Sequence, residues 1–416
     1  MRLLAIAILT VCVLSAADDP QLALILKAQT DFDRVDLSPA PQLPQSSACI
    51  QSQAALVPIA AKPDLPIVHF RKGWCTLASA TFTNTPALYT DAAAEFQKGI
   101  DAWPDRVALQ PKKTLPEPLP PALPIMAAIA RLLGNPNDPA VQTAPRQQIA
   151  GALASPVCVG TLMAVTSCQA DLQLGRAWLG YLALNSDQLA EAAKYFTGLQ
   201  ESGWSDWVAG RQAFQAGHYS AAANQYRSAI AIWQRSSDAS LRARFSPPRD
   251  LGLALTDLGG AQLLAGDATG AIATLDSAIK ADPAHARSFF YRARAKETAG
   301  RMDAAIADYG LAARTAFAGT VDLASGDAHL YRGIAAFRRK EFARAEDEFS
   351  SALNFSISPG LHADAVAWRH LAAVAAGNCE ASRDLLAHDL AAVSPFFPKS
   401  EASTLVAACP TASAAK

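Results

Sequence analysis

The histidines and acidic residues, which could do acid–base or metal chemistry, are not arranged as such sites require. His362 and His370, which fall on one predicted helix, are eight residues apart, too far to bind one metal from adjacent turns. No GxSxG, HExxH or phosphate-binding glycine loop occurs. Asp303, Asp308 and the acidic run Glu346–Glu348 are typical of a solvated helix face. We therefore expect no catalytic residue, no metal site and no cofactor.

Cysteine is the other residue type that could do chemistry, and its usage indicates disulfides. Of the seven cysteines, removal of Cys12 with the N-terminal segment described below leaves six, an even number. None is spaced as CxxC or CxxCH, so metal binding and haem attachment are not indicated. Several pairings are open, and their order along the chain favours Cys49–Cys75, Cys158–Cys168 and Cys379–Cys409.

The Cys379–Cys409 pair follows from the helices expected around it. A helix that begins at Cys379 should run to about Ala392, before the breaker Ser394–Pro398, and a closing helix from Ser400 then returns to Cys409. The two arms are similar in length, so an antiparallel hairpin brings both cysteines to its open end. We expect this bond to hold a terminal cap.

Residues 1–17 have the features of a secretory signal peptide. Arg2 gives a positive start, Leu3–Leu14 an apolar core, and Ser15–Ala17 a small-residue cleavage site. The apolar core is too short to span a bilayer, and no later run is long enough. The sequence therefore predicts a periplasmic or secreted protein with no transmembrane segment after signal removal. A retained anchor, or lipidation at Cys12, is the weaker alternative, because the residue before this cysteine is not small.

An internal repeat occupies residues 203–355. In each of four units a small residue is followed after seven positions by a turn residue, after five more by a second small residue, and after four more by a bulky one. The units begin 49, 34 and 40 residues apart, and the excess lengths match inserts at Ser236–Pro248 and Gly319–Ser325. The four units are Gly210, Gly217, Ala222, Tyr226; Gly259, Gly266, Ala271, Leu275; Ala293, Gly300, Ala305, Tyr309; and Gly333, Lys340, Ala345, Phe349.

This order of residues has a physical cause. Two antiparallel helices approach closely only where their side chains are small, and a bulky residue on the same face fills the remaining space. A turn glycine takes a positive φ at low cost. These units resemble the tetratricopeptide repeat, and the spacing of 34 residues between Gly259 and Ala293 is the period of that family.

The resemblance implies a tetratricopeptide protein with an all-α fold, and together with residues 1–17 it predicts an exported, bacterial-type member. We expect a right-handed α-solenoid of helix-turn-helix repeats that follows an N-terminal helical, proline-rich region. Ala92 and Phe96 indicate one isolated second helix far upstream. The expected domains are a signal peptide at 1–17, the helical and proline-rich region at 18–150, leading helices with a degenerate repeat at 151–200, four repeats at 203–355, and a degenerate repeat with a capping helix at 362–410.

The resemblance also indicates where a partner would bind, because the first helix of each unit lines the concave groove of such a solenoid. Packing between repeats or against an inserted loop is the alternative for the aromatic and arginine residues on these helices. Some family members clamp a C-terminal carboxylate there with a lysine. This chain has Trp207, Thr256, Phe290 and Leu330 at the equivalent sites, so no clamp is expected. The candidate groove residues are Trp204, Trp207, Arg211, Phe214, Phe290, Arg294, Phe337 and Arg338.

Residues 18–150 allow a second interpretation of the protein. We expect helices near Gln21–Val35, Ser47–Ile59 and Pro124–Leu133, and a stiff surface linker within the proline-rich stretch Pro104–Pro145. In this alternative, an envelope enzyme or carbohydrate-binding module has its working part in residues 18–150 and uses the repeats as an assembly arm. Self-association of the array is a third alternative.

The preferred hypothesis is an exported scaffold or adaptor, not an enzyme, that binds a protein or peptide segment in its groove. The net charge of −1 gives no general attraction to nucleic acid. Basic residues cluster between Arg287 and Arg344 but are interspersed with acidic ones, so ion pairing on helix surfaces is the simpler account. An acidic peptide or a cell-envelope polymer is a further candidate partner.

Overall fold

The structure is a computed structural model that describes residues 66–103, 119–135, 138–154, 156, 158, 165–199, 202–235, 245–318 and 325–409. Every regular element in these stretches is a helix, and one isolated parallel bridge joins Ser325 to Ser356. The predicted all-α class is confirmed. Within the same stretches no helix combines the length and the apolar character needed to cross a membrane. The signal peptide and the helices expected at Gln21–Val35 and Ser47–Ile59 lie outside the described residues.

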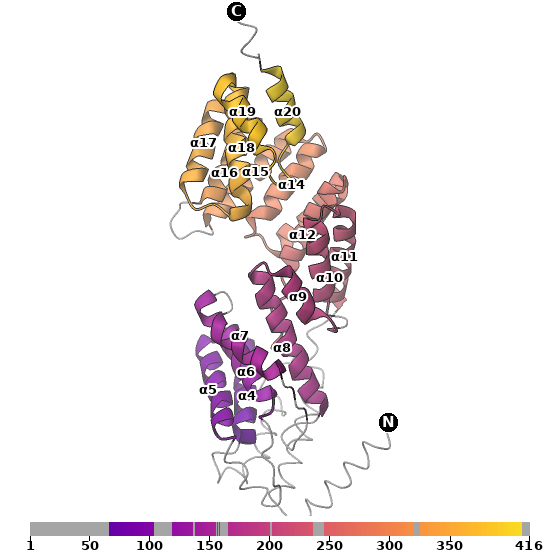
Figure 1. The fold of residues 1–416 in the computed structure, drawn as a ribbon, viewed down its shortest axis with the longest axis vertical. Helices are drawn as coiled ribbons and strands as arrows, with labels where there is room; N and C mark the ends of the chain where they lie inside the picture. Colours follow the sequence, from indigo (N-terminus) through magenta and orange to yellow (C-terminus); the bar gives the residue numbers. More distant parts are fainter. Residues whose placement is uncertain are drawn as a thin grey trace, which may run out of the picture. The chain divides into compact units, whose positions relative to one another are not determined.

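The chain divides into two compact units, coloured along the sequence in Figure 1. The first unit takes the residues up to Ser205 and the stretch Gln234–Pro248, and the second takes Asp206–Trp233 and the residues from Arg249 onward. The helices of the first unit are α4 (Pro66–Thr83), α5 (Pro86–Asp101), α6 (Ala122–Gly134), α7 (Pro139–Ala154), α8 (Val165–Asn185) and α9 (Leu189–Phe196).

Helix α6 is the centre of the first unit and covers the helix expected near Pro124–Leu133, whereas α7 corrects the linker interpretation for the residues up to Pro145. Helix α6 contacts α5, α7 and α8, and it is apolar and buried around almost its whole circumference, as expected for a central helix. Pro145, expected in the linker, lies inside α7 and is buried. Residues 104–118, which include most of the prolines, lie outside the described part.

The helix predicted from Ala92 and Phe96 is not isolated. It is α5, and α4 is its antiparallel partner, with Gly73 against Phe96. A Cβ atom added to Gly73 would lie 3.0 Å from the Phe96 ring. The sequence did not reveal this pair because the small and bulky residues are 23 positions apart, against 16 in the repeat units.

The insert predicted between the first two repeat units contributes to the core of the first unit. Its residue Phe245 is fully buried, and its carbonyl oxygen accepts a hydrogen bond of 2.7 Å from Trp178 Nε1. The Phe245 ring also packs edge-on against Trp74, at 5.4 Å between ring centroids. Since Trp74 and Trp178 are themselves among the largest fully buried side chains, the insert anchors α4 and α8 together.

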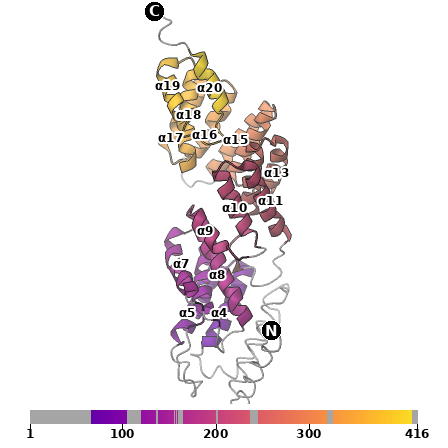
Figure 2. The ribbon, with the colours of Figure 1, turned by 45° about the vertical axis from the view of Figure 1, so that its right-hand side comes forward.

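The second unit is a succession of helix pairs followed by a last helix, as Figure 2 shows from a second side. Each predicted repeat is one pair, and α18 with α19 forms the degenerate pair expected after them. The helices are α10 (Trp204–Gln215), α11 (Tyr219–Arg235), α12 (Leu251–Leu264), α13 (Ala268–Ala281), α14 (Ala286–Thr298), α15 (Met302–Ala318), α16 (Gly326–Arg338), α17 (Phe342–Asn354), α18 (Pro359–Ala375), α19 (Cys379–Asp389) and α20 (Lys399–Ala408).

The two helices of each pair meet where the sequence places its small residues. A Cβ atom on Gly259 of α12 would lie 2.5 Å from Leu275 Cγ, and one on Gly210 would lie 2.7 Å from the Tyr226 ring. Leu275 and Tyr226 are 0 and 2% exposed, so the bulky residue fills the space that glycine leaves. In the fourth pair the turn residue is Lys340, with a φ of +63°, where the others have glycine.

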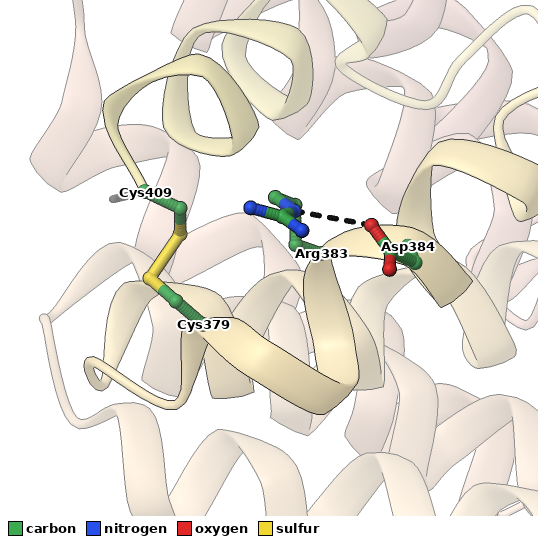
Figure 3. Close-up of a disulfide and its surroundings, with 4 residues drawn as sticks. All are labelled: Cys379, Arg383, Asp384 and Cys409. Carbon is green, nitrogen blue, oxygen red and sulfur yellow. Dashed lines mark hydrogen bonds and ion pairs between the residues drawn. A yellow bond between two sulfur atoms is a disulfide. The ribbon is translucent and has the colours of Figure 1, made fainter. Parts of the chain in front are cut away.

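Two disulfides lie within the described residues, and they join the pairs favoured by the sequence. Cys158 is bonded to Cys168, and Cys379 to Cys409, with Cα atoms 5.6 and 5.7 Å apart. Figure 3 shows that Cys379 begins α19 while Cys409 follows the end of α20. The third expected pair involves Cys49, which lies outside the described residues.

We predict that Gly259→Ala lowers the free energy of unfolding by about 1–3 kcal/mol, because the new methyl group overlaps Leu275. Gly310→Ala is the matched control, since a Cβ there has only Arg314 Nη1 nearby, at 3.8 Å. The control should leave stability unchanged or raise it by up to about 1 kcal/mol. Urea unfolding followed by circular dichroism measures both, and equal effects would contradict the packing account.

We predict that Cys379→Ser with Cys409→Ser lowers stability by about 3–4 kcal/mol, because the unfolded chain regains the freedom of a loop with a sequence separation of 30. Cys158→Ser with Cys168→Ser is the control, with a separation of 10 and a loss about 1 kcal/mol smaller. Thermal unfolding of both variants gives the comparison. A larger loss from the shorter loop would show that strain or packing outweighs chain entropy.

Candidate functional site

The two tryptophans predicted to line the groove are buried by the chain itself. Trp207 is 5% exposed; its ring packs against Trp233, and its Nε1 donates to Asp257 Oδ2 at 3.0 Å. Trp204 is 3% exposed and stacks on Phe196, with ring centroids 5.4 Å apart. Both side chains therefore pack helices together here, which is the alternative that the sequence leaves open.

The same holds at the other positions where the family clamp would lie. Thr256, Phe290 and Leu330 are all buried, and Thr256 Oγ1 is 2.6 Å from Ser288 Oγ on the neighbouring first helix. Phe337, another predicted groove residue, is 4% exposed and packs edge-on against Trp368. These residues join successive first helices to one another.

The predicted groove arginines Arg294 and Arg338 share one carboxylate. Both pair with Glu297, which also accepts a hydrogen bond of 2.7 Å from the Tyr309 hydroxyl. Arg338 binds Glu401 of α20 as well, at 2.7 Å, and its side chain is only 6% exposed. This network ties the last helix to α14 and α16, so in this structure the two arginines bind their own chain.

The segment Ser394–Pro398, named here the aromatic loop, is held by Asp364 of α18. The Ser394 amide donates to Asp364 Oδ1 at 2.7 Å, and the Ser394 hydroxyl donates to Oδ2 at 2.6 Å. Asp327 holds Ser358 in the same way one pair earlier. Burial raises the pKa of Asp364, and the hydrogen bonds from Ser394 act in the opposite direction.

Phe396 carries the aromatic loop onto the first helices of three successive pairs. Its ring stacks on Tyr291 of α14 at 4.2 Å between centroids and on Phe214 of α10 at 6.2 Å. A Cβ on Gly260 of α12 would lie 3.3 Å from Phe396 Cζ. We call this surface, formed by α10, α12, α14 and α16, the first-helix face. Phe396 is 7% exposed, so its ring covers the residues of the first-helix face that it contacts.

Beside Phe396 the first-helix face is polar. Burial raises the pKa of Asp257, and the positive charges of Arg211 and Arg287 partly oppose this. Burial also raises the pKa of Tyr291, to about 12. The pKa of Arg287 is raised, chiefly by Tyr291 and further by Tyr331 and Asp257. The Arg287 residue as a whole is exposed, and it adds a positive charge to this face.

One expectation about the acidic residues is wrong. Asp308 does not lie on a solvated face: it is 2% exposed and binds both Arg292 and Lys296, each at 2.7 Å. His370 is a packing residue, 9% exposed, with Nδ1 2.7 Å from Asp389 Oδ2, whereas His362 is exposed. Within the described residues no group of three or more His, Cys, Asp or Glu side chains is placed to hold a metal.

The sequence did not reveal the contacts of the aromatic loop. Two prolines and a serine dominate the local signal of Ser394–Pro398, which therefore indicates only a helix breaker. Two adjacent phenylalanines between those prolines were the available clue, since an exposed turn rarely keeps two large apolar side chains.

The repeat array matches a known family. The tetratricopeptide repeat family matches residues 256–320 and 311–362, which extend from within α12 to the first turn of α18. The chain therefore contains tetratricopeptide repeats, and the matched residues lie in its second helical unit. No curated protein matches the chain.

Several solved structures share part of this arrangement at low identity. A tetratricopeptide repeat protein from Parabacteroides merdae is 13% identical, covers 71% of this chain and 98% of its own, and has a TM-score of 0.37. Yeast Tom70 is 10% identical, with 94 and 96% coverage and a TM-score of 0.37. YrrB, described as having an unusual peptide-binding site, is 13% identical, with 46 and 89% coverage and a TM-score of 0.31.

We predict that Ser394→Ala raises the pKa of Asp364 further, because the lost hydroxyl stabilises the ionised carboxyl. The free energy of unfolding should fall by about 1–3 kcal/mol. This loss is largest above the folded-state pKa of Asp364, where the carboxyl is charged, and shrinks as the pH falls through that pKa.

Carboxyl-carbon NMR titration and unfolding at several pH values measure both effects. Ser403→Ala is the control, since the Ser403 hydroxyl binds only the Lys399 carbonyl on the exposed side of α20. An unchanged Asp364 pKa in Ser394→Ala would show that the hydroxyl does not hold the loop.

Proposed function

We propose that this chain is an exported scaffold that binds a protein segment on the first-helix face of its tetratricopeptide array. The observation that carries the proposal is the aromatic loop. A short non-helical turn of the chain lies on that face: Asp364 accepts from the Ser394 amide and hydroxyl, and Phe396 stacks on Tyr291. A surface that holds one such segment has the chemistry to hold another beside it.

The partner segment binds next to the loop, where the first-helix face is polar and accessible. Arg287 is exposed there, and Tyr291, Tyr331 and Asp257 raise its pKa. The positive charge of Arg211 acts on the same Asp257. Arginine is a common anchor in interfaces, because it buries much area and offers several hydrogen bonds. The buried groove residues Trp207, Phe290 and Phe337 support this surface from behind.

The class of protein supports a scaffold rather than an enzyme. Tetratricopeptide arrays present long surfaces to protein partners, and residues 256–362 belong to that class. An enzyme or carbohydrate-binding module in residues 18–150 is the second candidate. The helices described there, α4 to α7, pack into an apolar core, and this observation gives the second candidate no specific support.

Export is part of the proposal, and the cysteines support it. Cys158–Cys168 and Cys379–Cys409 are bonded, and structural disulfides persist in oxidising compartments such as the periplasm or the exterior of the cell. The signal-like residues 1–17 point the same way. We therefore propose a periplasmic or secreted location.

Site-specific photo-crosslinking tests the surface. A photoreactive residue in place of Arg287, on the first-helix face, should label a defined protein in native extract. The same residue in place of Lys280, exposed near the end of the second helix α13, should not. Arg211→Ala in the chain that carries the probe should lower the yield by about tenfold, because it removes a charged anchor.

Two results would contradict the proposal. Equal labelling from positions 287 and 280 would show that contact is non-specific. A partner labelled only from the helices α4 to α7 would transfer the binding function to the first unit and favour the second candidate.

A further inference from the structure

Four arginines meet at a cavity between the third and fourth repeat pairs, separate from the residues that hold the aromatic loop. The cavity has a volume of about 390 Å³ and is lined by residues of α15, α16 and α17 and the turn that joins the last two. Its lining residues are Gly310, Ala313, Arg314, Phe317, Arg332, Ala335, Arg339 and Arg344. Half of them are arginines and none is acidic.

Two of these arginines already bind carboxylates of the same chain. Arg332 Nη2 is 3.0 Å from Glu348 Oε1, and Arg344 Nη1 is 3.1 Å from Glu341 Oε2. The Arg332 guanidinium also lies over the Phe317 ring, 5.6 Å from its centroid. Within the protein, these two arginines therefore bind carboxylate groups.

The positive charges of the other two arginines are not neutralised by a carboxylate of the described residues. Arg314 and Arg339 are exposed, and among the described residues no carboxylate pairs with either. The cavity therefore carries an excess of positive charge on rigid helices, a field that favours an anionic ligand. Its walls between the charges are apolar, formed by Ala313, Ala335 and Phe317.

We propose that this cavity, named here the arginine pocket, binds a short acidic protein segment with neighbouring carboxylates and an apolar side chain. The carboxylates pair with Arg314 and Arg339, whose planar guanidinium groups bind carboxylate in a bidentate manner. The apolar side chain lies on Ala313 and Ala335. The proposal rests on the proposed function, since it names the chemistry of a protein partner, but it places that partner on a second surface.

Gly310 offers a way to close the pocket without changing its charge. A Cβ there meets only Arg314 Nη1, at 3.8 Å, so a larger side chain can grow into the open space. Gly310→Leu should therefore block the pocket and leave the fold intact. Circular dichroism of the full chain checks that the helices persist.

The test is fluorescence anisotropy of the full chain with a labelled peptide of alternating glutamate and leucine, beside its glutamine counterpart. The acidic peptide should bind, less tightly as salt rises, and the glutamine peptide should not. Arg314→Ala with Arg339→Ala, and separately Gly310→Leu, should each weaken binding at least about tenfold. Arg301→Ala with Lys280→Ala removes the same charge from exposed positions outside the pocket and should change affinity by less than about twofold.

Three results would overturn the proposal. These are no binding of the acidic peptide to the wild-type chain, equal loss in the two charge-removing variants, and displacement of the peptide by inorganic phosphate but not by acetate. The last result would assign the pocket to a phosphate ligand. Crosslinking from position 287 is unaffected by any of them, so the two proposals can fail independently.

Discussion

The close approach of two helices at a residue without a side chain is the constraint on which the second unit depends. Gly210, Gly259 and Gly333 each face a bulky residue that occupies the place where a Cβ would be. This contact fixes both the distance and the angle within a pair, and each pair then offers its neighbour a surface of defined shape. The array therefore repeats one local contact, in which a bulky side chain of the second helix packs against a small residue of the first.

That local contact explains why the array could be predicted from the sequence and the first unit could not. Gly259 and Leu275 are 16 residues apart, as are the equivalent residues of the other repeats, so their spacing recurs and can be detected. Gly73 and Phe96 make the same contact in α4 and α5, but longer helical arms separate each of them from the turn, and no second copy shares the spacing. The sequence therefore did not predict the contact between Gly73 and Phe96, because its spacing occurs only once.

The sequence identified the helices of the candidate site but not the contacts that its residues make. The sequence identified the first helices and their aromatic and arginine residues, several of which lie beneath or beside the aromatic loop. It gave no means of knowing that Phe396, more than 100 residues from Tyr291, would stack on it. Arg338 shows the same limit, because its partner Glu401 lies 63 residues away on a helix outside the repeat pattern. Neither Phe396 nor Glu401 lies within a repeat unit, so the spacing of the repeat does not predict such pairings.

The disulfide between Cys379 and Cys409 has a mechanical consequence. The bond bridges the start of α19 and the end of α20, so the aromatic loop lies inside a covalently closed stretch. Tension applied to the chain beyond Cys409 passes through the sulfur atoms to the start of α19 and bypasses everything between. Phe396 is thereby shielded from pulling on the C-terminal end, and only reduction or cleavage within the closed stretch would expose its contacts to that force.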